Sequence, residues 1–265
     1  MNRTSNVAIQ LSGSEVRHTS WPEALLYATW ISAFLGVGLM VAPKEAAAQT
    51  ASEVIAKTDG IMFPQRFAGI FQMDVEREDG GHRLYEMQIN RRGTSTLLFF
   101  QKPEVEKGRK LLRVGEDMWM MLPNVKRPVR VSAKQNLMGG DFNNNDVLRL
   151  SLTEDFNATF GESTADTWQV VLTAKNGSIT YAKVIAFVDK KTYIPLRYDY
   201  YTESGKHVKT MTYGKPGNRG DGTNVPLEWT MKNLVTGKSS VMTIKRLMPN
   251  EGPGPEAFQL NNLSK

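Results

Sequence analysis

The sequence contains no cysteine among its 265 residues. This absence excludes disulfide bonds, cysteine metal sites and thiol nucleophiles. It also excludes an N-terminal lipid anchor, because bacterial lipoproteins carry that lipid on a cysteine. If the chain is exported, we therefore expect a free protein without cross-links.

Histidine is almost as scarce, with three residues in the chain. Two of them, His82 and His207, lie outside the N-terminal region, each beside turn residues at the start of an expected strand, where a solvent-facing side chain is the simpler interpretation. The usual zinc sites need more such ligands. No G-x-S-x-G elbow is present, and "ESGK" and "VTGK" lack the spaced glycines of a phosphate loop. We expect no enzyme activity, catalytic residue, metal or cofactor. A hydrolase of envelope lipids is the minor alternative, and it would place one histidine beside a serine and an acid.

The chain carries a formal net charge of +6. The charges of the first 48 residues cancel, since they comprise Arg3, Arg17, Lys44, Glu15, Glu23 and Glu45. The excess on the remainder is scattered and forms no basic stripe, so we expect no nucleic-acid partner. It suits an anionic membrane surface or an acidic protein partner.

Long apolar runs are absent except for one. Residues 24–43 carry no charge, and three small residues follow at Ala46, Ala47 and Ala48. This layout is typical of a secretory signal peptide that comprises residues 1–48. The alternative is an uncleaved anchor, because twenty apolar residues can just span a bilayer. Residues 49–265 would then form a single domain on the far side of the membrane.

After a short helical pattern at residues 51–59, with Ser52 as the expected N-cap, apolar residues recur with period two. Tight turns separate the strands, including Asn176-Gly177, a strong hairpin signal. About ten strands are expected from twelve candidate segments, which are 66–77, 82–91, 96–101, 109–114, 118–122, 129–133, 167–174, 179–189, 193–202, 207–213, 225–232 and 240–247. The fold class is mainly β, with an antiparallel meander.

Two strands are apolar on both faces, "TLLFF" and "MWMML". A sheet with one solvated face would alternate more clearly. Either both faces are covered by protein, or one face binds an apolar ligand. The methionines suit irregular apolar surfaces, although they are also ordinary core residues.

A polar run, "DFNNND", follows a glycine pair. Asp141, Asn143 and Asn145 match the first three ligand positions of a calcium loop. Position 6, which needs glycine, is Asp146, and position 12, which needs glutamate, is Leu152. The pattern therefore favours a turn, since asparagine tolerates turn conformations and bonds its own backbone.

Residues 115–146 are the most distinctive part of the chain. Trp119 and Met121 share one face of the strand at 118–122, and a basic cluster of Lys126, Arg127 and Arg130 follows at its end. This cluster could bind phosphate or acidic side chains. The plain alternative is a buried strand followed by a solvated loop.

This block resembles the signature of the LolA-like outer-membrane lipoprotein-sorting protein family. The family pattern has a W-x-x-L-P stretch, then basic residues around R-x-S, then an M-G-[GS]-D turn. The matching residues here are Trp119, Leu122, Pro123, Lys126, Arg127, Arg130, Ser132, Met138, Gly139, Gly140 and Asp141. Supporting stretches extend the resemblance over nearly all of residues 49–265.

The resemblance implies a curved antiparallel sheet that forms an incomplete, half-open β-barrel, with a few short helices across the open side. It implies a monomeric periplasmic carrier that binds lipid or lipoprotein acyl chains for transfer toward the outer membrane, with an inner-membrane transporter and an outer-membrane acceptor as partners. The residues expected to line the lipid groove are Phe71, Met73, Leu98, Phe100, Trp119 and Met121, with Leu137 and Met138 in a flap. Lys126, Arg127 and Arg130 would meet a headgroup or an acidic partner.

An acyl cargo also makes physical sense. Shielding each methylene from water is worth about 0.8 kcal/mol, so a sixteen-carbon chain would cost on the order of 12 kcal/mol to carry through water unshielded. The second hypothesis is an accessory or scaffold protein of an envelope export system, which would use the same fold to bind protein partners.

Overall fold

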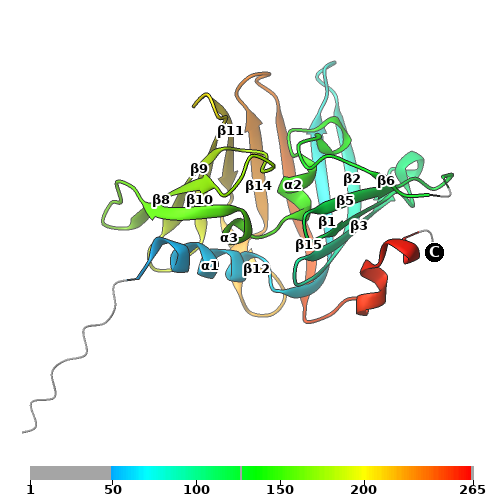
Figure 1. Ribbon diagram of the computed structural model, residues 1–265, viewed down its shortest axis with the longest axis horizontal. Coiled ribbons are helices and arrows are strands. Elements are labelled where there is room, and N and C mark those ends of the chain that lie inside the picture. Colours follow the sequence, from blue (N-terminus) through cyan, green and yellow to red (C-terminus); the bar gives the residue numbers. More distant parts are fainter. Residues whose placement is uncertain (1–48, 126, 264–265) are drawn as a thin grey trace, which may run out of the picture. The chain divides into compact units, whose positions relative to one another are not determined.

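A computed structural model describes residues 49–125 and 127–263. Its main sheet has 13 strands, all paired antiparallel, in the spatial order β6-β5-β4-β3-β2-β1-β15-β14-β11-β10-β9-β8-β7. The sheet is curved and is not closed into a barrel (Figure 1). The expected mainly β fold is therefore confirmed, with more strands than the ten foreseen.

The strands of the first half are neighbours in the sheet in chain order, and a 3₁₀ helix, η1 (Glu104–Glu106), lies between β3 and β4. These strands are β1 (Arg66–Glu76), β2 (His82–Arg92), β3 (Ser95–Lys102), β4 (Lys110–Val114), β5 (Asp117–Met121) and β6 (Val129–Arg130). The strands of the second half are β7 (Phe156–Phe160), β8 (Thr167–Ala174), β9 (Lys183–Asp189), β10 (Pro195–Tyr201), β11 (His207–Tyr213), β14 (Glu228–Asn233) and β15 (Ser239–Pro249). A separate pair, β12 (Pro216–Asn218) and β13 (Asn224–Pro226), was not foreseen. Because β15 pairs with β1, the two halves join into one sheet.

Three helices cover one face of the sheet, which we call the inner face (Figure 1). They are α1 (Ala51–Met62), α2 (Asn144–Leu148) and α3 (Leu152–Asp155). The last two belong to residues 131–155, the crossover segment, which connects β6 at one edge of the sheet to β7 at the other. The helical cover that the resemblance implied is thus supplied by α1 together with this connection.

The N-cap of α1 is Thr50, so the expected cap at Ser52 is wrong. The Thr50 hydroxyl accepts a hydrogen bond from the Glu53 backbone N–H, and the Glu53 carboxylate accepts one from the Thr50 N–H. This reciprocal capping box satisfies two otherwise free donors and fixes the start of the helix. The cap at Ser52 lacked the acidic residue three positions later, because position 55 is Ile55.

Buried apolar side chains form two clusters on opposite faces of the sheet. The larger one fills the space between the inner face and the cover, and Leu98 and Leu111 belong to it. The smaller one joins Leu112 and Met121 to Phe258 and Leu263, from the C-terminal 3₁₀ helices η3 (Pro255–Phe258) and its neighbour η4 (Leu260–Asn262). Since Leu111 and Leu112 are adjacent on β4, they point to opposite faces. Both faces of the sheet at β3–β5 are therefore covered by protein.

The glycine pair before the polar run has a different role at each position. Gly139 has a φ of +76°, in the left-handed region that glycine adopts without strain. Gly140 lies where the chain approaches the sheet closely: a Cβ there would lie 2.9 Å from Val75 Cγ2 and 3.1 Å from Ser240 Oγ. The pair therefore lets the 3₁₀ helix η2 (Leu137–Gly139) end against β1 and β15.

We predict that Gly140→Ala lowers the free energy of unfolding by about 1–3 kcal/mol, because the added methyl group overpacks a tight contact. Gly177→Ala is the control, since a Cβ at that position meets nothing within 4 Å. Chemical denaturation followed by circular dichroism measures both. Equal stability of the two variants would contradict the close approach.

Candidate functional site

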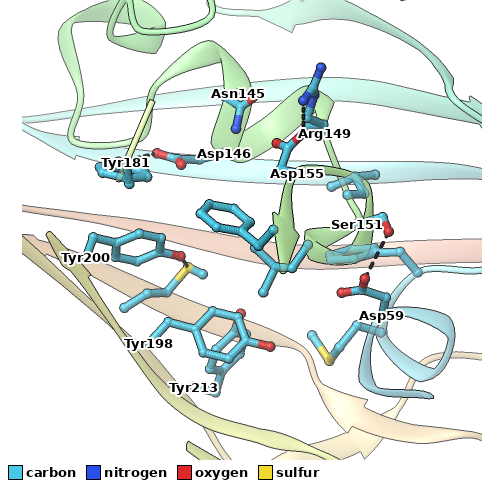
Figure 2. A pocket seen from close by; sticks show the side chains of 16 residues that line it. Asp59, Asn145, Asp146, Arg149, Ser151, Asp155, Tyr181, Tyr198, Tyr200 and Tyr213 are labelled. Carbon is cyan, nitrogen blue, oxygen red and sulfur yellow. Dashed lines mark hydrogen bonds and ion pairs between the residues drawn. The ribbon is translucent and has the colours of Figure 1, made fainter. Parts of the chain in front are cut away.

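The candidate site is a cleft between the cover and strands β10 and β11 on the inner face (Figure 2). Its cavity volume is about 70 Å³. The apolar side chains that line it are Met62, Phe63, Leu150, Leu152, Phe156 and Met211. The polar ones are Asp59, Asn145, Asp146, Arg149, Ser151, Asp155, Tyr181, Tyr198, Tyr200 and Tyr213. The cleft thus combines an apolar wall with a fringe of hydroxyl and charged groups.

Four tyrosines form the sheet side of the cleft, and they pack as two pairs. The ring centroids of Tyr181 and Tyr200 are 4.5 Å apart, and those of Tyr198 and Tyr213 are 5.3 Å apart. Burial raises the pKa of all four hydroxyls above the usual value, so they remain neutral at physiological pH. They present aromatic faces with polar tips, a surface that accepts apolar chains and can still donate hydrogen bonds.

Asp59 fastens the crossover segment to α1. Its Oδ2 accepts hydrogen bonds from the Ser151 hydroxyl (2.9 Å) and from both the backbone N–H and the hydroxyl of Thr153 (3.1 Å each). Burial raises the pKa of Asp59, and the hydrogen bonds from Thr153 and Ser151 oppose that shift. The contact joins the last turns of α1 to the beginning of α3, beside the cleft (Figure 2).

The polar run that resembled a calcium loop fastens the other end of the cover. Asn143 caps α2 and forms a capping box with Asp146. The Asn143 side-chain amide donates to the Tyr181 hydroxyl, which in turn donates to Asp146 Oδ2 (3.1 Å). Asp141 accepts from the Ser240 hydroxyl (2.8 Å), and its carbonyl accepts from the Lys209 ammonium group. These oxygens are occupied by protein donors, and within residues 49–125 and 127–263 no three acidic, histidine or cysteine side chains group as a metal site would need.

Arg149 lies at the boundary between α2 and α3 and is the most enclosed cation of the cleft. Its side chain is 5% exposed and forms ion pairs with the buried Asp155 and, at 2.7 Å, with Glu116. A second ionic cluster nearby pairs Glu154 with Arg91 and Arg113, both almost fully buried. A charge removed from water needs such partners, so these pairs fix the position of the crossover segment.

The structure brings five of the expected groove residues together in the larger cluster. Phe71, Met73, Leu98, Phe100 and Leu137 are at most 3% exposed. Met138, in η2, packs against this cluster. These side chains already fill the space beneath the cover, and none of them lines the cleft itself. Whether they contact a lipid stays a prediction.

Trp119 and Met121 do not join the others. They lie on the outer face, where both pack with Leu112 and with Phe258 from the C-terminal 3₁₀ helices. On β5 it is Met118 and Met120 that face the larger cluster. The strand is apolar on both faces, so its periodicity could not show which face is which. The cross-strand register decides it: Leu111, which faces inward, pairs with Met120, and Leu112 pairs with Trp119.

The structure describes two residues of the basic cluster. Arg127 is exposed, Arg130 forms an ion pair with Asp117, and Lys126 lies outside the described residues. The two histidines lie elsewhere: His82 Nδ1 is 3.0 Å from Asp74 Oδ1, and His207 Nε2 is 3.6 Å from Asp199 Oδ1. Neither lines the cleft.

The sequence prediction missed the residues of the cleft. It drew the lining from strands of the first half, whereas the tyrosines and Met211 come from the second half. A signal was present, since Tyr198 and Tyr200 alternate in "YDYY" and Met211 and Tyr213 alternate in "MTY". Period two places each pair on one face of its strand. The pairing of β10 with β11 then brings Tyr198 opposite Met211.

We predict that Asp146 makes the protein less stable as the pH rises. Burial raises the pKa of Asp146 to about 6, although Lys209, the Asn143 N–H and the Tyr181 hydroxyl oppose the shift. Because the folded pKa lies above the ordinary value of 3.8, the stability that this group contributes is full below about pH 4 and is lost as the pH rises through 6. In the wild type, Asp146 should lower the free energy of unfolding by on the order of 2 kcal/mol as the pH rises from about 4 through 6, and Asp146→Asn should remove this decrease.

The measurement is urea denaturation between pH 4 and pH 8 for the wild type and the variant. Glu203→Gln, in the exposed β10–β11 turn, is the control for loss of one carboxylate. Parallel stability curves for wild type and Asp146→Asn would show that Asp146 is not the group responsible.

Comparisons with known proteins agree with this geometry. One family model, whose description is that of an uncharacterized protein, matches residues 92–265. Among curated protein sequences no match is found. Within the two described ranges, no helix combines the length and the apolar character that crossing a bilayer requires.

Three solved structures share the fold. A LolA superfamily protein of Nitrosomonas europaea is 28% identical, with a TM-score of 0.72, over 80% of this chain and 98% of that one. An outer-membrane lipoprotein-sorting protein domain of Vibrio parahaemolyticus is 22% identical, with a TM-score of 0.68, over 81% and 97%. A DUF1329 family protein of Desulfovibrio piger is 21% identical, with a TM-score of 0.70, over 80% and 97%. The family model spans more than half of the chain, so the protein belongs to that family, and these likenesses show that its fold is the LolA-like fold that the sequence resemblance implied.

Proposed function

We propose that the protein is a periplasmic carrier and not an enzyme, and that it binds an acyl chain of a lipid or lipoprotein in the cleft for transfer toward the outer membrane. The observation that carries this proposal is the cleft beneath the cover, whose apolar wall comes from α1 and the crossover segment on one side and the sheet on the other. The names of the similar structures, a LolA superfamily protein and a lipoprotein-sorting domain, support the same class of cargo.

The cleft has the form of a closed state. Its volume of about 70 Å³ is far below the roughly 300–1,000 Å³ of typical ligand pockets, so an acyl chain fits only after the cover moves. The cover is suited to move because α2 and α3 have five and four residues and are held by side-chain contacts. Within the described residues, the backbone of the crossover segment forms hydrogen bonds with backbone groups of the sheet only at its two ends, where Val131 bonds to Met118 and Asp155 bonds to Lys175, directly after β8. Local opening of such segments costs less free energy than global unfolding.

An acyl chain would replace the contacts that opening breaks. Val147, Leu148 and Leu152 of the cover pack against the inner-face cluster, and lifting them would expose that cluster to water. A bound chain would cover the same surface and gain about 0.8 kcal/mol for each methylene that it buries. The carrier would therefore be closed when empty and open when loaded. The residues predicted from the sequence, such as Phe71 and Phe100, would then form the floor that the chain reaches.

Periplasmic location rests on residues 1–48, which lie outside the described residues and which we propose to be a signal peptide. N-terminal sequencing of the exported protein tests this directly. A mature chain that starts at residue 49 is expected, and a chain that keeps residues 24–43 would instead be an anchored protein. The donor and the acceptor would be an inner-membrane transporter and an outer-membrane protein.

We predict that the protein purified from the cell envelope carries lipid, which organic extraction and mass spectrometry will detect. Met211→Trp should reduce the lipid content and weaken the affinity for 1-lauroylglycerol by roughly tenfold or more, equivalent to about 1.4 kcal/mol. The reason is steric, because Met211 lines the cleft and the indole would occupy its space.

Leu234→Trp provides the matched control, since Leu234 is 43% exposed in the β14–β15 turn, away from the cleft. Both variants should keep the fold, which circular dichroism can verify. Absence of lipid from every preparation, together with no binding of 1-lauroylglycerol to the wild type, would reject the carrier. It would favour an accessory protein that binds protein partners, the function compatible with a permanently filled inner face.

A further inference from the structure

Arg149 lies between two cavities. One is the cleft described above. The other, of about 280 Å³, lies outside it and is lined by the β4–β5 turn, residues 130–134 and part of the β8–β9 loop. Asn145 and Arg149 line both cavities, so their side chains stand between the two. Three cations, Arg130, Lys134 and Arg149, line the outer cavity, against two carboxylates, Glu116 and Asp117.

The guanidinium of Arg149 is only partly satisfied. Nη1 contacts the buried Asp155, which fixes the orientation of the group. Nη2 is 2.7 Å from the Glu116 carboxylate. Nε is buried and has no hydrogen-bond partner among the residues that the structure describes. Nε and Nη2 form one edge of the planar group, and such an edge binds the two oxygens of a carboxylate or phosphate side by side. Half of this fork is therefore unused.

Glu116 and Arg149 differ in how firmly they are held. The Arg149 side chain is 5% exposed, whereas that of Glu116 is 72% exposed at the β4–β5 turn. Gly115, the preceding residue, has a φ of +59°, as the tight turn requires. An exposed carboxylate in a turn can swing into solvent at little cost, because water solvates it again. The buried Arg149 cannot leave, because the buried Asp155 carboxylate would then lose its ion-pair partner. Glu116 is thus the replaceable partner.

We propose that the Nε–Nη2 edge of Arg149 binds the anionic headgroup of an amphiphile, a carboxylate or a phosphate, and that this headgroup displaces Glu116. This inference rests on the proposed function, since the acyl chain of the same molecule would occupy the cleft on the other side of Arg149. Glu116 stands in for the headgroup when the carrier is empty. The arrangement selects singly acylated anionic amphiphiles over neutral ones of equal chain length.

The test is titration calorimetry at 0.15 M salt with three twelve-carbon ligands below their micelle concentrations. Laurate supplies a carboxylate, lauroyl lysophosphatidylglycerol a phosphate, and 1-lauroylglycerol a neutral headgroup. We expect the wild type to bind at least one of the two anions several-fold more tightly than the neutral ligand. Which anion binds better identifies the source of the oxyanion, and either result supports the proposal.

Glu116→Gln is the decisive variant, because removing a competing anion should increase the affinity for the anionic ligand several-fold and leave that for 1-lauroylglycerol unchanged. Asp117→Asn is the matched control. It removes the same charge from the neighbouring residue, the first of β5, but its carboxylate pairs with Arg130. Both variants keep the buried ion pair of Arg149 with Asp155, so we expect both to fold and their affinities to be directly comparable.

Equal gains in Glu116→Gln and Asp117→Asn would reduce the effect to general electrostatics and overturn the proposal. Binding of 1-lauroylglycerol as tightly as the anions would also overturn it, although the carrier function would stand. Binding of none of the three ligands would reject the carrier function itself. The two failures are therefore distinguishable.

Discussion

The inner face of an open sheet must be kept from water, and in this protein the crossover segment, residues 131–155, accomplishes most of that task. The segment is the connection between the two edge strands, so its ends are fixed by the sheet and its middle lies across the apolar surface. Polar contacts hold the middle in place: Asp141 with Ser240, Asp146 with Tyr181, and Glu154 with the buried Arg113. The architecture, the cleft and the proposed uptake of an acyl chain all depend on this one covering.

Hydrogen bonds and ion pairs, in addition to apolar packing, hold the crossover segment against the sheet. Hydrogen bonds and ion pairs are directional, so the cover has one well-defined closed position. Their net contribution is modest, because water offers the same groups alternative partners when the cover lifts. Under the proposed function, the segment would close in one position and would open without unfolding the sheet. Arg149 adds a second role, since its incomplete hydrogen bonding makes the closed position receptive to an anion.

The sequence contains enough information for the fold class, and the reason lies in particular patterns. Tight turns such as that before His82 and period-two strands such as the one ending at Glu76 depend on local interactions, so they are legible in a linear sequence. The block from Trp119 to Asp141 carried the family resemblance, which supplied the curvature and the cover. Boundaries were less accurate, since the strand expected to begin at Ile179 begins at Lys183.

The site was less predictable, because its residues meet through long-range register. The two faces of β5 are both apolar, so only the pairing of Leu112 with Trp119 shows that Trp119 points outward. The tyrosines of β10 and β11 become a cleft wall only when α1 and the crossover segment are folded over them. The contact between Arg149 and Glu116 spans two distant segments that no motif connects. Such contacts follow from packing and not from local sequence.

The most direct test of the account is hydrogen–deuterium exchange, measured with and without a bound acyl ligand. If the crossover segment is the moving cover, binding will change the exchange of residues 141–156 and of the last turns of α1. The strands of the outer-face cluster, β4 and β5, will exchange as before. Unchanged exchange in the crossover segment, with the effect confined to the outer face or the C-terminal 3₁₀ helices, would contradict the account.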